Sequence, residues 1–141
     1  MKLLAFLPCE KIIISENENV ATLIAILQEL TAQIPSGMTV PENALAPMTW
    51  WIFVMWLREA EDDPTLQHKA SVSLVFPSAK RITLGEMTFD LGVGIVRNMV
   101  QTIGFPISEA GSLSLVLDLD GEEKTTYPLS VKYILPRVPT A

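Results

Sequence analysis

Residues 113–119, Leu-Ser-Leu-Val-Leu-Asp-Leu, carry leucine at every odd position, and residues 127–135 repeat the same period of two. Because side chains on a β-strand alternate between its two faces, each segment predicts a strand with one buried face and one mostly solvated face. The intervening segment, 120–124, is polar and begins with the turn-forming pair Asp120-Gly121. Together the two segments predict a β-hairpin on the face of an antiparallel sheet.

Other strand patterns lie between turn residues along the rest of the chain. They cover residues 3–7 and 11–15, 67–76, 81–84, 87–91 and 95–103, and a loop that crosses between sheets is expected at 38–47. Pro8 predicts a sheet edge or a bulge, because proline cannot donate a hydrogen bond to a neighbouring strand. Residues 20–34 fit both a helical stripe and one face of a strand, and we favour a strand because the flanking elements are strands.

The segment from Thr49 to Arg58 is apolar on both faces. Such a strand is either central and covered on both sides or lies at an interface. A buried tryptophan on a central strand is typical of immunoglobulin-like sandwiches, which favours the core for the first face, although exposed aromatic platforms also occur in sugar-binding modules. Aromatic residues and methionine are enriched at the centres of interfaces, which favours the second face as the partner surface. The first face holds Trp50, Ile52, Val54 and Trp56, and the second holds Trp51, Phe53, Met55 and Leu57.

The spacing of these elements predicts the fold class. Many short strands separated by turn residues are typical of a β-sandwich. The chain has 141 residues, the length of one ordinary domain, and no internal repeat. The prediction is a single all-β domain over residues 1–141, an antiparallel immunoglobulin-like β-sandwich.

The composition disfavours several classes of partner. The formal net charge is -6 and the sequence pI is about 4.7, so a nucleic acid or an anionic membrane surface is not expected to bind. Charged residues make up 18% of the chain, below the usual share of about a quarter, so a protein partner is expected to cover some apolar surface. The single cysteine and the lack of a secretion signal or membrane-spanning run predict a cytoplasmic protein.

The order of the segments also resembles an uncharacterised bacterial family, a conserved domain of unknown function. The resemblance rests on residues 3–10, on residues 19–27 and on residues 105–111 followed by the hairpin and residues 127–131. It implies an immunoglobulin-like β-sandwich and a strand, not a helix, within residues 20–34. It implies no activity, cofactor or partner. The strand from Trp50 to Leu57 is more apolar than the family pattern.

Residues suited to catalysis are few. His68 is the only histidine, no nucleophile elbow of the form Gly-x-Ser-x-Gly occurs, and nothing in the sequence places Cys9 beside His68. One cysteine and one histidine cannot supply the usual zinc ligands. Gly92-Val93-Gly94 lacks the third glycine and the lysine of a phosphate-binding loop. The sequence therefore predicts no enzyme and no cofactor.

Two acidic segments are weak candidates for a metal site. Carboxylates on loops can bind Ca²⁺ if the loops meet at one end of the sandwich, but the ligand spacing of an EF-hand is absent. A solvated hairpin tip and an acidic turn explain the same residues without a metal. The candidate ligands are Asp118, Asp120, Glu122, Asp62 and Asp63.

These observations predict a non-enzymatic protein-binding or assembly module, a homodimer or other homo-oligomer. It is expected to self-associate through the face formed by Trp51, Phe53, Met55 and Leu57. The alternative, from a different class, is a Ca²⁺- or carbohydrate-binding β-sandwich that uses the acidic loops.

Overall fold

The chain folds into two β-sheets packed face to face. The computed structural model describes residues 1–15 and 20–134. Those residues form no helix, and strands make up most of them, which confirms the all-β prediction. The strands are β1 (Lys2–Ser15), β2 (Val20–Ile26), β3 (Glu29–Gln33), β4 (Leu45–Leu57), β5 (His68–Val75), β6 (Arg81–Phe89), β7 (Ile95–Pro106), β8 (Gly111–Leu119) and β9 (Glu122–Ile134).

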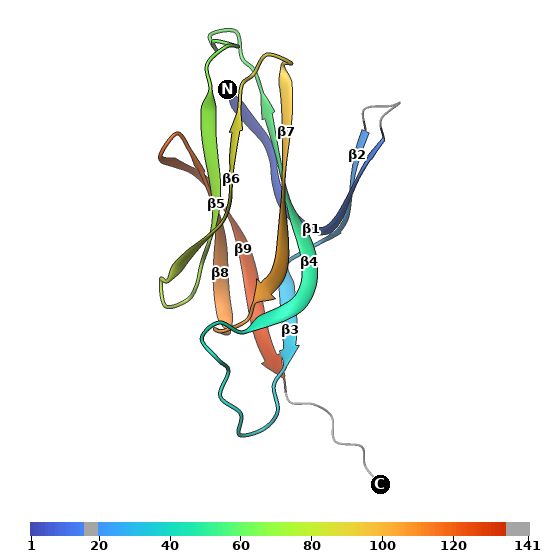
Figure 1. Ribbon diagram of the computed structural model, residues 1–141, viewed down its shortest axis with the longest axis vertical. Helices are drawn as coiled ribbons and strands as arrows, with labels where there is room; N and C mark the ends of the chain where they lie inside the picture. The colour runs from blue at the N-terminus through green and yellow to red at the C-terminus, as the bar shows by residue number, and fades with distance from the viewer. Residues whose placement is uncertain (16–19, 135–141) are drawn as a thin grey trace.

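One sheet has the strand order β2-β1-β4-β7 and the other β3-β9-β8-β5-β6 (Figure 1). The five-stranded sheet curls into a half-barrel. The chain crosses between the sheets where residues 34–44 join β3 to β4, as expected for that loop, although β4 begins at Leu45 and is longer than the sequence pattern indicates. Likewise, the two short strands predicted at 81–84 and 87–91 form one strand, β6, which ends at Phe89 and whose pairing with β5 shifts at Gly85.

The predicted hairpin is formed by β8 and β9. Leu119 pairs with Glu122, so the connecting loop has two residues, Asp120 and Gly121. Their φ angles are 51° and 85°. Two positive φ values in succession are the requirement of a type I′ turn, whose twist matches that of the flanking strands. The Asp-Gly pair therefore fixes the position of this hairpin and the register of the two residue pairs beside the turn; the register then shifts by one residue between Asp118 and Leu117.

β1 is one continuous strand that changes partner near its middle. It pairs with β4 from Lys2 to Cys9 and with β2 from Cys9 to Ser15. Pro8 is buried opposite Ile52, and the irregularity lies between Leu3 and Ala5, so the prediction of an edge or bulge at Pro8 is wrong.

The missing N–H of Pro8 is accommodated locally. Leu27 N–H donates to the Pro8 carbonyl at 2.9 Å. The reciprocal bond would need an N–H on Pro8 directed at the Leu27 carbonyl. Proline has no N–H, so the Tyr127 hydroxyl takes the place of that donor. It donates a hydrogen bond to the Leu27 carbonyl at 3.0 Å.

Residues 20–34 are extended, so the choice of strand over helix is confirmed, but they form two strands in different sheets. β2 pairs with β1, and β3 pairs with β9. The β3–β9 pairing is parallel, which corrects the prediction of an entirely antiparallel sandwich. The chain turns between the sheets after Ala25, whose φ is 56°, so neither a glycine nor a proline marks the break.

The core lies between the two sheets. Trp50, Ile52, Val54 and Trp56 on β4 are at most 1% exposed, so the prediction that this face is buried is confirmed. Trp50 packs against Phe105, and its indole N–H donates to the Gly104 carbonyl at 3.0 Å. The opposite side of the core comes from alternate residues of β5 and β8, among them Leu74 and Leu115.

Candidate interaction surface

The second face of β4 lies on the outer side of the four-stranded sheet. Its residues Trp51, Phe53, Met55 and Leu57 form one row, and cross-strand neighbours on β1 and β7 flank this row on either side. We call this surface the apolar face. It also includes the residues on the same side of the two neighbouring strands: Lys2, Ala5, Leu7 and Cys9 on β1 and Ile95, Arg97, Met99, Gln101 and Ile103 on β7.

The chain itself covers part of the apolar face. Phe53 is only 3% exposed, and Trp51, Met55 and Leu57 are half-buried. Within the apolar face, the most exposed apolar residues lie one strand further out, on β7, where Ile103 is 80% exposed. The apolar surface that the molecule offers is therefore shifted from β4 towards the edge of the sheet.

These β7 residues are not among those predicted for the partner surface from the sequence. The alternation of residues 95–103 places Ile95, Met99 and Ile103 on one face together with Arg97 and Gln101. That mixture resembles an ordinary solvated face. Only the pairing of Phe53 with Met99 and of Leu57 with Ile95 makes the isoleucines and the methionine an extension of the β4 row.

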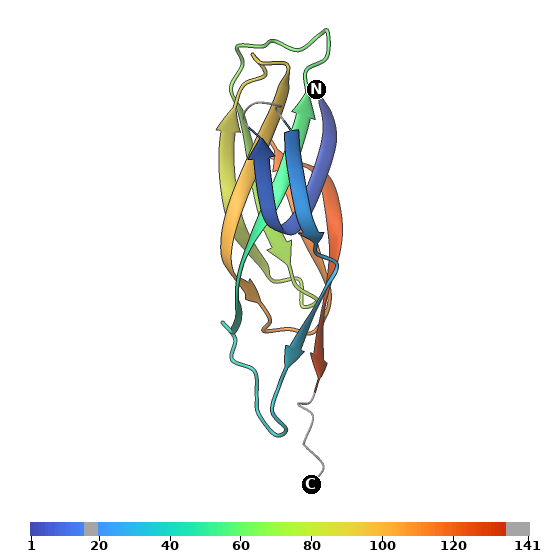
Figure 2. The same ribbon diagram turned by 90° about the vertical axis from the view of Figure 1, so that its right-hand side faces the viewer.

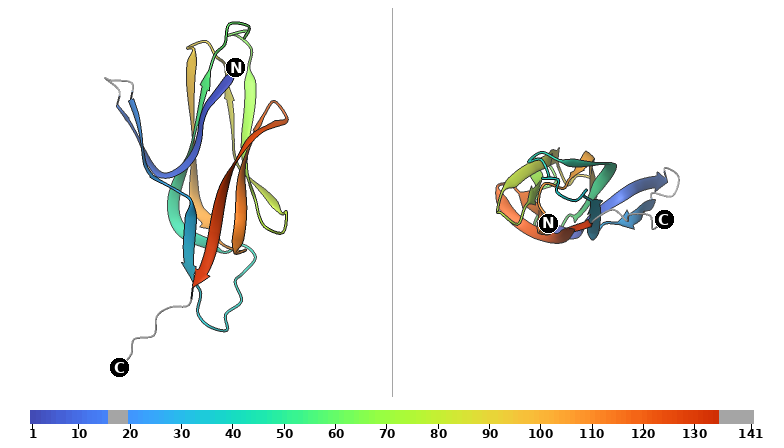
Figure 3. Two further views of the ribbon diagram at one scale, coloured as in Figure 1. Left: turned by 180° about the vertical axis from the view of Figure 1, so that it is seen from behind. Right: turned by 90° about the horizontal axis from the view of Figure 1, so that it is seen from below.

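A second exposed apolar element is the arm, which we define as Lys11–Ser15 of β1 together with β2. Beyond Cys9 these two strands pair only with each other, and they stand away from the rest of the molecule (Figures 1 and 3). Figure 2 shows the arm in front of the four-stranded sheet. Ile13, Val20, Ile24 and Ile26 are each 41–48% exposed. A two-stranded ribbon is marginally stable in water on its own, so apolar residues on it gain most from a covering partner.

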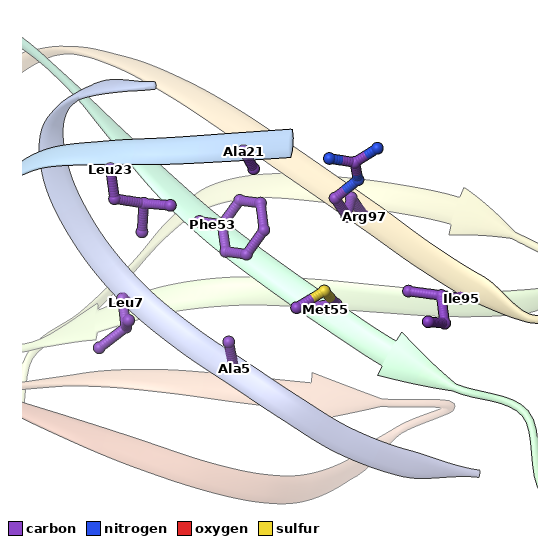
Figure 4. Close-up of a pocket in the computed structure, with 8 residues that line it drawn as sticks. All are labelled: Ala5, Leu7, Ala21, Leu23, Phe53, Met55, Ile95 and Arg97. Atoms are coloured by element: carbon purple, nitrogen blue, oxygen red, sulfur yellow. The ribbon is translucent and has the colours of Figure 1, made fainter. Parts of the chain in front are cut away.

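A groove separates the arm from the apolar face. It measures about 430 Å³, and its walls come from β1, β2, β4 and β7. In Figure 4, Leu23 of β2 and Phe53 of β4 approach it from opposite sides. Its lining is almost entirely apolar, so it suits apolar side chains of a partner. The lining residues are Ala5, Leu7, Ala21, Leu23, Phe53, Met55, Ile95 and Arg97.

The acidic turn at residues 59–63 is occupied by internal contacts. Asp62 binds the Met1 ammonium group at 2.6 Å and accepts a hydrogen bond from Glu59 N–H at 2.7 Å. The hydrogen bond from Met1 is the main reason that the pKa of Asp62 is lowered, and the charge of His68 contributes. Asp63 accepts from the hydroxyl and the backbone N–H of Thr65, which lowers its pKa as well.

The acids near the β8–β9 turn are also engaged. Asp120 binds His68 Nδ1 at 2.8 Å and accepts from Lys69 N–H at 2.9 Å, and these contacts, the His68 bond first, lower its pKa. Asp118 pairs with Arg81. Glu122 is exposed at the start of β9.

The two acidic segments approach each other through His68, which binds Asp120 and acts electrostatically on Asp62. Among the described residues, however, no three carboxylate, histidine or cysteine side chains are grouped so that they could hold a metal ion. Four of the five candidate ligands, Asp62, Asp63, Asp118 and Asp120, therefore form separate contacts with their neighbours, and Glu122 is exposed.

Cys9 and His68 belong to different sheets. Cys9 lies between Trp51 and Ile26 with no exposed surface, and burial raises the pKa of its thiol. His68 begins β5 in the other sheet, and its Nδ1 is held by Asp120. A buried thiol with a raised pKa is a poor nucleophile.

None of the described residues form a helix of the length and apolarity required to cross a membrane. Neither the models of known protein families nor the curated proteins contain a match to this chain. The family resemblance inferred from the sequence therefore stays a prediction.

Proposed function

We propose that this chain is a non-enzymatic protein-binding and assembly module that associates with further copies of itself through the apolar face. The observation that carries the proposal is the contrast between this face and the whole chain. The chain has 16 acidic residues and a formal net charge of -6, whereas the register positions of the apolar face include no acid and only two bases, Lys2 and Arg97.

Two physical arguments support this assignment. Exposed apolar area is removed from water when a partner covers it, which is the main driving force of most protein association. Two acidic molecules also repel each other, and an acid-free face is where they approach with the least repulsion. The internal contacts of His68, Cys9 and the acidic loops support a role in binding over one in catalysis.

We also propose that the sandwich is immunoglobulin-like. The support is that strands distant in sequence are neighbours, with β4 beside β7 and β8 between β5 and β9, as in Greek-key connections. The buried Trp50 on β4 fits the same class. The arm and the parallel β3–β9 pairing are additions to that plan.

Light scattering after size exclusion, over a range of concentrations, tests the self-association. The wild-type chain is expected to increase in mass with concentration. Ile103→Glu places a charge on the apolar face and is expected to weaken association. Val93→Glu is the matched control, because Val93 is 81% exposed but lies in the turn before β7, outside the face. A wild-type chain that stays monomeric at all concentrations contradicts the proposal.

A further inference from the structure

The free edge of β2 is the least protected strand edge in the described part of the molecule. Edge strands have unpaired backbone N–H and C=O groups, and natural proteins usually shield them with charges, proline, bulges or covering segments. β2, Val-Ala-Thr-Leu-Ile-Ala-Ile, contains no charged residue, no proline and no glycine. Three of its apolar side chains, Val20, Ile24 and Ile26, are exposed.

The other three edge strands carry protection. β3 is short, with five residues, and begins with the charged Glu29. β6 carries Arg81 and Glu86 and has an irregular pairing. β7 packs against β6, so closely that a Cβ on Gly85 would lie 2.6 Å from the Val100 side chain.

From this contrast we propose that β2 pairs antiparallel with β2 of a second copy of this chain, across a two-fold axis. The two four-stranded sheets are then joined through their arms. This inference rests on the proposed self-association and adds a backbone contact at β2, a strand that lies outside the apolar face.

Charge favours a second copy as the occupant. A partner chosen by opposite charge would be recognised through acidic residues, and β2 offers none. An uncharged edge is complementary to another uncharged edge, and the β2 of a second copy has that property. In a two-fold arrangement the same residues meet, so no like charges are brought together along the pairing.

The size of the contact indicates a weak dimer. Ala25 has a φ of 56°, so the regular part of β2 is residues 20–24. Five residues at about 3.3 Å each give an edge roughly 16 Å long, and pairing of such edges covers a few hundred Å² per copy. Stable interfaces bury about 800 Å² per partner. The association is therefore expected at high micromolar concentrations, and added salt is expected to strengthen it by screening the net charge of -6 on each copy.

Ile24→Lys tests the edge at a position that is 41% exposed. Ile24 lies opposite Lys11 on β1, so Ile24→Glu, which Lys11 attracts, is the second variant and separates loss of pairing from loss of the arm. Either variant brings like charges near each other across the axis and is expected to raise the dissociation constant about tenfold or more. Val93→Lys and Val93→Glu add the same charges at an exposed apolar position outside β2 and are expected to leave the constant unchanged. Equal effects at positions 24 and 93 would contradict the inference.

Single-cysteine variants at positions 21–24 test the two-fold axis. When two copies of β2 pair antiparallel across a two-fold axis, the residue at the axis lies opposite the same residue of the second copy, at a Cα separation that a disulfide can span. The residues on either side of it lie farther from their own copies. Oxidation is expected to link one of these variants into covalent dimers far more than the others. The wild-type chain, whose Cys9 is buried, is the control and is expected to stay unlinked.

The outcomes separate the two proposals. A strictly monomeric wild-type chain overturns both of them. Association that survives Ile24→Lys and links no position in β2 overturns only the β2 pairing and leaves the apolar face as the contact. Growth into open-ended assemblies, which a head-to-tail contact would give, also overturns the two-fold pairing.

Discussion

The β8–β9 hairpin and the arm are both antiparallel pairs of apolar strands, yet they occupy opposite situations in the molecule. β8 has a strand on each side and buries Leu113, Leu115 and Leu117 against the other sheet. The arm has no second layer, and isoleucines remain exposed on it. The comparison shows that the same local pattern places apolar side chains in the core in one hairpin and leaves them exposed to water in the other.

The largest expected difference concerns buried and exposed aliphatic side chains in the two hairpins. Leu115→Ala on β8 removes a side chain with no exposed surface, and we expect a loss of about 2–5 kcal/mol in the free energy of unfolding. Ile24→Ala on β2 is expected to cost less than about 1 kcal/mol, because much of that side chain is already in water. Urea unfolding of dilute protein measures both values, and similar losses would remove the distinction between the hairpins.

The turn of the β8–β9 hairpin gives the next effect. Gly121 has a φ of 85°, and a Cβ built on it meets nothing within 4 Å, so only backbone strain opposes a side chain there. Gly121→Ala is expected to destabilise the chain by about 1–2 kcal/mol. Gly121→Asn is expected to cost less, because asparagine tolerates positive φ in turns. Thermal or urea unfolding of the two variants gives the comparison, and an alanine that is as stable as glycine would contradict the type I′ assignment.

This turn also shows what the sequence predicts well. Asp120-Gly121 lies between two alternating segments, so the local chemistry of the turn residues fixes the hairpin and the register beside the turn without knowledge of the rest of the fold. The register shift between Leu117 and Asp118 is not predicted by this pattern. The apolar character of β4 on both faces is likewise visible in the sequence, and it correctly places Trp50 and Trp56 in the core.

Non-local features are not visible in the same way. The period of two continues from β2 into β3, so the change of sheet between Ile26 and Glu29 leaves no mark in the pattern. The parallel pairing of β3 with β9 joins segments about 100 residues apart. Pro8 indicates an edge by local rules, but the change of β1 from one partner to the other allows it inside a sheet. The exposure of Ile103 depends on which strand lies at the edge, and this order is set by the whole fold.

A smaller effect is expected where the base of the arm meets β9. The Tyr127 hydroxyl donates to the Leu27 carbonyl, which has no N–H partner on Pro8. Tyr127→Phe keeps the ring but removes this bond, and we expect a loss of about 1 kcal/mol in the free energy of unfolding. Tyr133→Phe, which removes a hydroxyl bound to the Ile107 carbonyl far from the arm, is a control for hydrogen exchange. Faster exchange of the arm amides is expected for Tyr127→Phe alone, and an equal change in both variants would show that this bond does not anchor the arm.

The smallest effect concerns the carboxylate that ties the β8–β9 turn to β5. The pKa of Asp120 is lowered in the folded chain, mainly by its bond to His68. Its contacts with His68 and Lys69 therefore contribute fully to the free energy of unfolding above the unfolded pKa of about 4, and this contribution is lost as the pH falls through the lowered pKa.

Asp120→Asn keeps a residue that tolerates positive φ but removes the charge. We expect it to be less stable than wild type by under about 1 kcal/mol at neutral pH, because the carboxylate is exposed. The difference should shrink below about pH 4 as the wild-type carboxyl takes up a proton. Unfolding measured from pH 7 to pH 2.5 gives this profile, and a gap that stays constant to the lowest pH would mean that the charge of the Asp120 carboxylate does not cause the difference.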